Sequence, residues 1–285
     1  MPLAFYGKRA DASFWDSHWK RILKEDIGSI MRNLEGSFLA QMMKKWLPKE
    51  EKILEGGCGL GQWVLYLKGK GYNIVGVDFA GATIRQVKNL FPNLPVVVGD
   101  ILSLPFRKEE FAAYLSFGVI EHFEEGPAKA LVEAYRVLQE GGLFFCTVPY
   151  FSPLRRLKKV VFKSYHQPKA NEEFYQWAFT KREVMNLVRM QGFEVRRIIP
   201  FDLIKGIKDE FLGARELYEL LRARSHRIEA TMKVGKNDVV NKPAWLPACK
   251  GVKLGLKRIL DRYLLRNLFG HMLLIIAEKQ RGEER

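Results

Sequence analysis

The chain has 285 residues, of which 47% are hydrophobic and 28% charged, and its formal net charge at pH 7 is +15. This apolar content excludes a mainly disordered chain, and the length suffices for one large domain or two small ones. Cys58, Cys146 and Cys249 show neither an even count nor the spacing of metal ligands. We therefore expect no disulfide framework, no metal site and a reducing compartment.

The termini and the charge distribution indicate a cellular compartment and a class of partner. The first 15 residues lack the apolar core of a signal peptide, and the longest late apolar run, 272–277, is too short to cross a bilayer. We expect a cytoplasmic protein, soluble or peripheral at the inner membrane face. Residues 1–150 hold 18 Lys+Arg against 17 Asp+Glu, whereas residues 151–285 hold 29 against 15. The surface that meets an anionic partner is therefore expected in the second half.

The element pattern, taken in chain order, predicts an α/β fold. Residues 34–47 place apolar side chains on one helical stripe that ends before Pro48, and this helix is expected to pack on a sheet edge. From residue 52 to 149, short β-branched runs alternate with helical stretches, first KILE, then NIVGVD, PVVVGD, FAAYLSFG and LFFCTVP. Such alternation predicts a doubly wound, mostly parallel sheet with helices on both faces.

The regular rhythm stops after Pro149. Residues 151–177 are basic and rich in aromatic side chains, residues 178–201 resume helix, glycine and strand, and residues 202–269 form a second irregular stretch before a last strand. We expect N-terminal helices over 1–49, a core over 50–150, 178–201 and 270–280, and a basic helical cap built from the insertions 151–177 and 202–269.

Four glycines stand in six positions directly after the first core strand, in the segment GGCGLG over 56–61. Glycine accepts positive φ and leaves room for a ligand to approach the backbone, and the helix that follows directs free N–H groups at that ligand. A tight turn with no ligand is the simpler reading, but four glycines at the carboxyl end of a parallel strand favour a nucleotide-type site. The dinucleotide pattern G-x-G-x-x-G fits poorly. With Gly57 and Gly59 as its first two glycines, the third would fall at position 62, which is Gln62.

The segment EGGCGLG, from Glu55 to Gly61, resembles motif I of the class I S-adenosylmethionine-dependent methyltransferases. The strand NIVGVD, the segment PVVVGDILSLPF, the exit AAYLSFGVIEHF and the turn YRVLQEGGLFFCTVP resemble the later motifs, in the family's order. The fourth-strand exit is most similar to the small-molecule branch, methyltransferase type 11, which includes quinone-biosynthesis enzymes. The resemblance implies a Rossmann-like sheet whose last strand is antiparallel, and it does not extend into the two insertions.

The resemblance also implies roles for single residues. S-adenosylmethionine would be the cofactor and S-adenosylhomocysteine the product, with Glu55 ordering the bend or meeting the methionine amino group. Asp78 ends the second strand, where a carboxylate would hold the two ribose hydroxyls. The remaining cofactor residues are expected at the glycines, the adenine and the fourth strand: Gly57, Gly59, Gly61, Phe79, Asp100, Ile101 and Phe117.

Glu121 and His122 follow the fourth strand, beside the place expected for the reacting methyl group. A histidine near neutral pKa suits a general base for a hydroxyl acceptor, whereas the same pair could instead cap or brace the next helix. Both interpretations remain open from the sequence.

Three functions compete on this evidence. The first is methyl transfer to a small acceptor, anionic or lipid-like, with basic amphipathic segments such as SPLRRLKKVVFKSY and GVKLGLKRILDRYLLRNLF lying on an anionic membrane. The second is RNA methylation, with the basic half binding phosphates, although an Asp-Pro-Pro-Tyr-like segment for base amino groups is absent after the fourth strand. The third is cofactor binding without catalysis. The intact acids Asp78 and Asp100 favour an enzyme, and the aromatic residues of 150–179 favour a small apolar or ring-bearing acceptor over nucleic acid.

Overall fold

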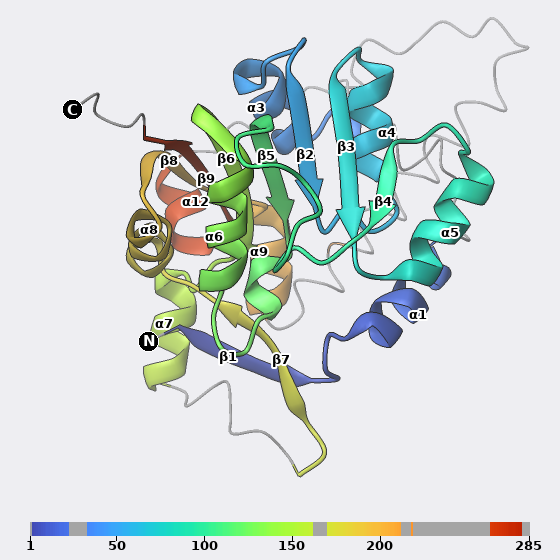
Figure 1. Ribbon diagram of the computed structural model, residues 1–285. Coiled ribbons are helices and arrows are strands. Elements are labelled where there is room, and N and C mark those ends of the chain that lie inside the picture. The colour runs from blue at the N-terminus through green and yellow to red at the C-terminus, as the bar shows by residue number, and fades with distance from the viewer. Residues whose placement is uncertain (1, 23–32, 162–169, 212–217, 219–262, 281–285) are drawn as a thin grey trace, which may run out of the picture. The chain divides into compact units, whose positions relative to one another are not determined.

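The computed structural model describes residues 2–22, 33–161, 170–211, 218 and 263–280 (Figure 1). The chain forms two compact units, the first comprising Met1–Phe151, Tyr165–Ile199 and Met272–Arg285 and the second Ser152–Ser164 and Pro200–His271. Much of the predicted cap, including most of 202–269, lies outside the described residues. No described helix is long and apolar enough to cross a membrane.

A seven-stranded sheet forms the core and confirms the predicted α/β class. The strand order is β4-β3-β2-β5-β6-β9-β8. The strands are β2 (Lys52–Gly56), β3 (Asn73–Asp78), β4 (Val96–Val98), β5 (Phe111–Phe117), β6 (Leu138–Pro149), β8 (Phe193–Phe201) and β9 (Met272–Lys279). The pairs β2–β3, β2–β5, β3–β4 and β5–β6 are parallel, and β6–β9 is antiparallel, as expected for the last strand.

The chain winds away from β2 in both directions, so the strand order reverses between β2 and β5. Helix α4 (Gln62–Gly69) follows β2, α5 (Gly81–Leu90) follows β3 and α6 (Ala128–Val137) follows β5. Right-handed crossovers that run in opposite directions place α4 and α6 on opposite faces of the sheet (Figure 1). The reversal opens a crevice at the carboxyl ends of β2 and β5, where α/β sheets bind ligands.

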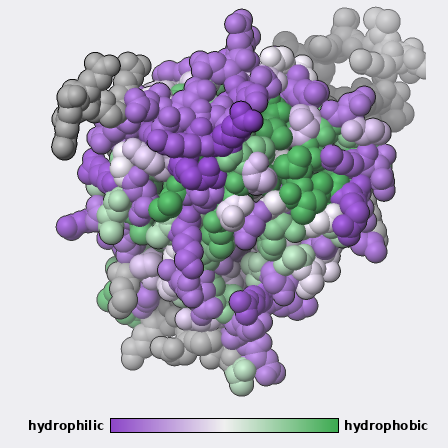
Figure 2. Space-filling view, in the orientation of Figure 1, coloured by the Kyte–Doolittle hydropathy of each residue, from purple (hydrophilic) through white to green (hydrophobic). Residues whose placement is uncertain are grey.

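Local signals explain several element boundaries. Ser37 caps α3 (Phe38–Trp46) by accepting from the Ala40 N–H at 3.1 Å, and Leu47 ends that helix before Pro48. Thr180 and Glu183 form a reciprocal capping box at the start of α8 (Lys181–Met190). The surface seen in Figure 2 is largely hydrophilic, with apolar side chains in small groups, while β-strand side chains such as Ile53 and Leu115 are fully buried.

A second, two-stranded sheet was not expected from the sequence. Strand β1 (Leu3–Gly7) pairs antiparallel with β7 (Glu173–Ala178), with a register shift between Phe5 and Tyr6. Residues 170–177, expected in the cap, therefore belong to the same compact unit as the large sheet. Helix α1 (Ala12–Ile22) follows β1 in that unit.

The second unit contains three described helices: α7 (Pro153–Val161), α9 (Leu203–Glu210) and α12 (Tyr263–Phe269). Helix α12 packs against both others. The basic stretch 155–163 expected for the cap falls on α7 up to Val161, while Phe162, Lys163 and the stretch 251–262 lie outside the described residues.

Candidate functional site

The glycine bend after β2 adopts a backbone that only glycine accepts readily. Gly57, Gly59 and Gly61 have φ values of 75°, 51° and 65°. A Cβ on Gly57 would lie 2.5 Å from Val119 Cγ2, and one on Gly59 would lie 2.6 Å from a ring carbon of Trp19. The bend therefore needs glycine for its conformation and for the close approach of neighbouring groups.

Asp78, at the end of β3, holds the bend in place. Its Oδ2 accepts from the Gly59 N–H at 2.7 Å and its Oδ1 from the Ala80 N–H at 2.9 Å. Burial raises the pKa of Asp78, while these two N–H groups act in the opposite direction. Each carboxylate oxygen keeps further lone pairs for a hydroxyl donor on the pocket side.

Glu55 lies on β2 beside Asp78 and is 3% exposed. Burial, and then the nearby Asp78 carboxylate, raise the pKa of Glu55 well above its usual value. Among the described residues no group hydrogen-bonds its Oε2, although Glu55 lines the pocket. A buried acceptor without a partner at a cavity wall fits a ligand that carries a donor.

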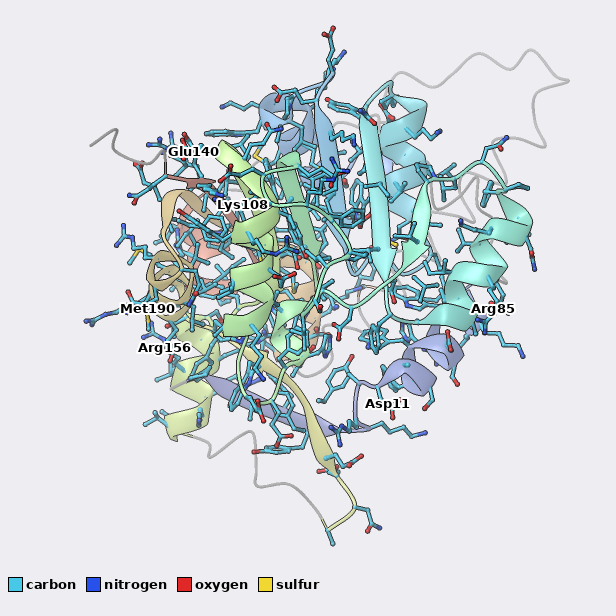
Figure 3. All side chains as sticks on the ribbon, viewed as in Figure 1. Asp11, Arg85, Lys108, Glu140, Arg156 and Met190 are labelled. Atoms are coloured by element: carbon cyan, nitrogen blue, oxygen red, sulfur yellow. The ribbon has the colours of Figure 1, made fainter. Side chains whose placement is uncertain are left out.

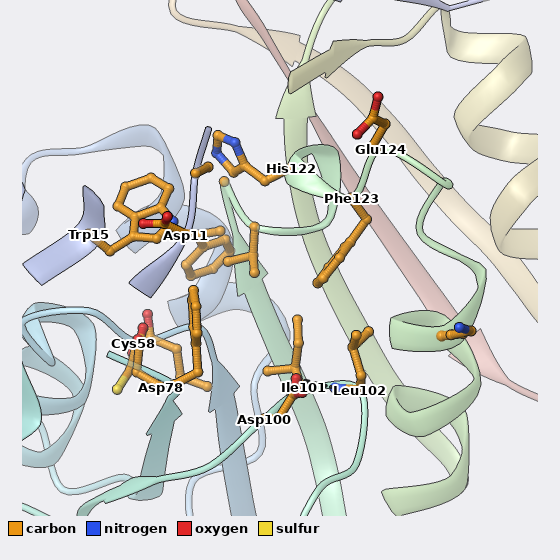
Figure 4. Close-up of a pocket in the computed structure, with 18 of the residues that line it drawn as sticks. Asp11, Trp15, Cys58, Asp78, Asp100, Ile101, Leu102, His122, Phe123 and Glu124 are labelled. Atoms are coloured by element: carbon orange, nitrogen blue, oxygen red, sulfur yellow. Dashed lines mark hydrogen bonds between the residues drawn. The ribbon is translucent and has the colours of Figure 1, made fainter. Parts of the chain in front are cut away.

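A pocket of about 540 Å³ opens at the crevice and lies within the first unit. Its volume is in the range typical of small-molecule sites. Predicted residues line it at the bend, β3, the segment after β4 and β5: Glu55, Gly57, Asp78, Phe79, Asp100, Ile101, Phe117 and His122. In Figure 4, Asp100 and Ile101 lie at one end of the pocket, and His122 and Trp15 lie at the other.

Three predicted site residues do not line this pocket: Gly59, Gly61 and Glu121. Gly59 lies under the Trp19 indole, and Gly61 is the left-handed cap residue of α4. Glu121 is 2% exposed, and its Oε2 has no hydrogen-bond partner among the described residues. Because it is buried, its pKa rises to about 8, so Glu121 is protonated at neutral pH.

His122 ends a short 3-10 turn, Ile120–His122, after β5. Its Nδ1 lies 2.8 Å from the Tyr175 carbonyl oxygen, and its ring centroid is 5.1 Å from the rings of both Trp15 and Tyr175. Burial lowers the pKa of His122, so the ring is neutral near pH 7. A carbonyl only accepts, so the proton sits on Nδ1, which leaves the Nε2 lone pair available as a base.

The N-terminal helix contributes pocket residues that sequence reasoning left unplaced. Trp15 and Trp19 of α1 stack with a centroid distance of 5.7 Å, and both line the pocket. Asp16 Oδ1 accepts from the backbone N–H and the hydroxyl of Thr83, at 2.8 and 2.7 Å, and so caps α5 from another element. The Trp-x-x-x-Trp spacing put both rings on one helix face, but nothing local indicated that this face covers the bend.

The inserted strand β7 completes the end of the pocket near His122. Besides the Tyr175 carbonyl that orients His122, the indole N–H of Trp177 donates to the Phe123 carbonyl at 3.1 Å. Phe174 of the same strand lines the pocket. Cys58 also lines it, but burial raises the pKa of its thiol, which disfavours a thiolate nucleophile. No metal-ligating cluster occurs among the described residues.

Comparison with known proteins identifies a recognised domain that contains the glycine bend and the strand ends of the site. Residues 54–146 match the family model described as "Methyltransferase domain". A Mycolicibacterium smegmatis protein described as "Probable S-adenosylmethionine-dependent methyltransferase" is 27% identical over 143 residues, which are 50% of this chain and 52% of that protein. The chain thus spans about half the length of this relative.

Two further relatives differ in their described acceptors. A mouse protein (Mus musculus) described as "Probable tRNA methyltransferase 9B" is 33% identical, over 42% of this chain and 28% of that protein. The demethylmenaquinone methyltransferase of Staphylococcus carnosus is 28% identical, over 61% of this chain and 80% of that protein.

A solved structure has a similar fold. It is a chain in the complex between the Haloferax volcanii Trm112 methyltransferase activator and a methyltransferase, with a TM-score of 0.56 and 15% identity. The alignment covers 97% of this chain and 99% of that one.

Proposed function

We propose that this chain, which contains a class I S-adenosylmethionine-dependent methyltransferase domain, methylates a small apolar or ring-bearing acceptor in the pocket beside His122. The observation that carries the proposal is the composition of that end of the pocket. Trp15, His122, Phe123 and Phe174 line it with aromatic rings. The acidic side chains of Asp11 and Glu124 lie at the same end (Figure 4). Aromatic walls beside acidic groups suit a small ring-bearing molecule better than a phosphate backbone, which the carboxylates would repel.

The residues at the bend fit the cofactor. Glu55 Oε2 is a buried acceptor without a partner among the described residues, and would receive a hydrogen bond from the methionine amino group. Asp78 would accept from the ribose hydroxyls, and Asp100, with the Ile101 backbone, would meet the adenine. Phe79 and Phe117 would pack against the ring system. When bound, S-adenosylmethionine supplies an activated methyl group on a positively charged sulfur.

The protein's own contribution to the reaction is orientation and proton removal. The aromatic walls would hold the acceptor in line and exclude water. His122 Nε2 would take the proton of an acceptor hydroxyl as that oxygen gains the methyl group, and would later release the proton to solvent. The hydrogen bond from Nδ1–H to the Tyr175 carbonyl keeps the imidazole in the required tautomer.

Two variants of His122 test its role. Asparagine can donate to the Tyr175 carbonyl in place of Nδ1 but offers no base, so His122→Asn is expected to lower kcat by about 10²-fold or more. Its affinity for S-adenosylhomocysteine, measured by calorimetry, should stay near wild type. His122→Ala removes both groups and serves as the comparison. Unchanged turnover in the Asn variant would make His122 a bracing residue only.

The acceptor class is tested by transfer of labelled methyl groups into cell extract, separated into organic, small aqueous and nucleic-acid fractions. Label in either small-molecule fraction supports the proposal, and the organic fraction would identify a lipid-like acceptor. Label in nucleic acid overturns it. No label, with cofactor binding confirmed, would instead favour a cofactor-binding protein without catalysis.

RNA is the second candidate acceptor, for a specific reason. The mouse relative is described as a tRNA methyltransferase, and residues 151–285 of this chain carry a net charge of +14. That charge would attract RNA phosphates, and the resulting binding would weaken steeply as the salt concentration rises. RNA ranks second because the aromatic walls near His122 suit a small acceptor better than a phosphate backbone.

A further inference from the structure

The second unit exposes an unusual share of apolar side chains. Among the described residues, twelve large apolar side chains are exposed, and half of them lie in this unit. They are Leu157, Val160 and Val161 of α7, Ile204 of α9, Phe211 and Leu264. The three helices form only a small part of the described chain, so a random scatter of exposed apolar residues does not explain this share.

Helix α7 presents three of these side chains on one face. Leu157, Val160 and Val161 are spaced three and four residues apart, which places them on the same side of a helix. They are 57%, 78% and 58% exposed. In an ordinary amphipathic surface helix such an apolar stripe faces the core, whereas here it faces outward.

The opposite face of α7 is fixed to its own unit by charged groups. Arg155 is 4% exposed, and its Nε donates to Glu210 Oε1 at 2.7 Å. Lys158 donates to Glu210 Oε2 at 3.0 Å and to the Glu210 carbonyl at 2.7 Å. With polar side chains turned inward and apolar ones outward, the orientation of α7 is set by this buried ion cluster.

Basic residues border the outward apolar face. Arg156 is exposed on α7 (Figure 3), and Lys159 follows one turn later. An apolar stripe bordered by cations matches the boundary between anionic headgroups and acyl chains. RNA phosphates would pair with the cations but would leave the apolar stripe in water, so the arrangement favours a bilayer over nucleic acid.

We infer that α7 docks on an anionic lipid bilayer, with Leu157, Val160 and Val161 entering the headgroup boundary and Arg156 meeting lipid phosphates. This inference goes beyond the proposed function and does not depend on the identity of the acceptor. It assigns the second unit a role in bringing the protein to a membrane surface.

Flotation of the full chain with vesicles tests the inference. The vesicles are phosphatidylcholine alone, or phosphatidylcholine mixed with phosphatidylglycerol. We expect binding to the mixed vesicles only, with a partition coefficient lowered at least about tenfold by the triple variant Leu157→Ser, Val160→Ser, Val161→Ser. Arg156→Ser should lower it about fivefold.

A matched control separates the stripe from general surface hydrophobicity. Met190, in the first unit, is 77% exposed on α8, so Met190→Ser removes a similar apolar side chain and should leave binding unchanged. The thermal unfolding temperature and the cofactor affinity of the triple variant should match those of the wild type. This result would show that the substitutions leave the fold intact.

Three results would overturn the inference: no binding of the wild type to mixed vesicles, equal binding by the triple variant, or an equal loss with Met190→Ser. In parallel, tRNA binding at low salt should be the same for the wild type and the triple variant. A loss of tRNA binding without a loss of vesicle binding would assign the stripe to nucleic acid. Methyl transfer to a dissolved acceptor reports the proposed function separately.

Discussion

Three buried carboxylates near the pocket differ in how many hydrogen bonds each oxygen receives. Both oxygens of Asp78 accept from backbone N–H groups, whereas Glu55 and Glu121 each keep one oxygen without a partner among the described residues. Burial raises the pKa of all three carboxyl groups. The N–H groups of Gly59 and Ala80 oppose this rise at Asp78, whereas a single backbone hydrogen bond opposes it at each of the two glutamates. A protonated Glu121 also leaves its neighbour His122 without a carboxylate that would favour the imidazolium.

Glu121→Gln is expected to remove a pH dependence of stability. The folded-state pKa of Glu121 is about 8 and the usual value is 4.5, so the unfolded chain releases this proton first as pH rises. Wild-type stability should therefore fall between pH 4.5 and pH 8, by at most about 5 kcal/mol from this group, while glutamine does not titrate. Urea unfolding of both proteins at pH 5 and pH 8 measures the difference. A difference that stays constant over this range would contradict the prediction.

Gly59→Ala is expected to weaken both folding and cofactor binding. The new Cβ would meet the Trp19 ring at 2.6 Å and would sit at a φ of 51°. Gly71 is the matched control, because its φ is 84° but no atom lies within 4 Å of its Cβ position. Gly71→Ala should cost about 1 kcal/mol from backbone strain alone, and Gly59→Ala should cost more.

Adding Trp19→Ala to Gly59→Ala separates the two causes. If the clash is responsible, the double variant should recover part of the stability lost in the single one, as measured by urea unfolding. Equal losses in the variants at Gly59 and Gly71, with equal affinity for S-adenosylhomocysteine, would show that close approach at the bend does not matter.

At the scale of elements, segments outside the repeating strand–helix pattern complete the pocket. Strand β1 pairs with β7, and β7 supplies the carbonyl that orients His122. Helix α1 supplies two tryptophans and is held at α5 by Asp16. The parallel core thus provides the bend, the carboxylates and His122, while the N-terminal and inserted segments add Trp15 and Phe174 to the aromatic end where we place the acceptor.

Glu210→Gln is expected to destabilise the second unit strongly. The Glu210 side chain is 6% exposed and binds both Arg155 and Lys158, so its loss removes the carboxylate that two cations of α7 share. Breaking a buried ion pair costs about 3 kcal/mol or more. Urea unfolding measures the loss.

An exposed ion pair provides the control for that variant. Glu194 pairs with Arg196, and their side chains are 49% and 40% exposed. Glu194→Gln should change stability by less than about 1 kcal/mol, because water screens the pair. Equal effects of the two substitutions would show that burial does not strengthen the Glu210 cluster.

At the scale of the whole molecule, charge and chemistry occupy different parts of the chain. Residues 1–150, which hold most of the pocket, are nearly neutral, while residues 151–285 carry a net charge of +14. The second half also holds α7, with its outward apolar stripe. The excess of positive charge thus belongs to the part of the sequence that contains α7, the helix that we propose docks on an anionic bilayer.

The sequence by itself determined the α/β class and the position of the glycine bend. Strand and helix periods are local properties, and a run of closely spaced glycines marks a bend with positive φ values, which glycine adopts most readily. Both features are therefore visible without a structure. The parallel order then brings the ends of β2, β3 and β5 to one edge, which is why predicted residues from separate motifs line one pocket.

Tertiary structure alone decided which partners meet across long distances. The pairing of Leu3–Gly7 with Glu173–Ala178 joins segments that carry no mutual signal, because a strand's pattern specifies its faces but not its partner. Tertiary structure also separates Glu121 from His122, although the two are adjacent in sequence. Glu121 is buried away from the pocket, whereas His122 lines it. That difference arises from the turn after β5 and from the packing of β7, which local sequence does not encode.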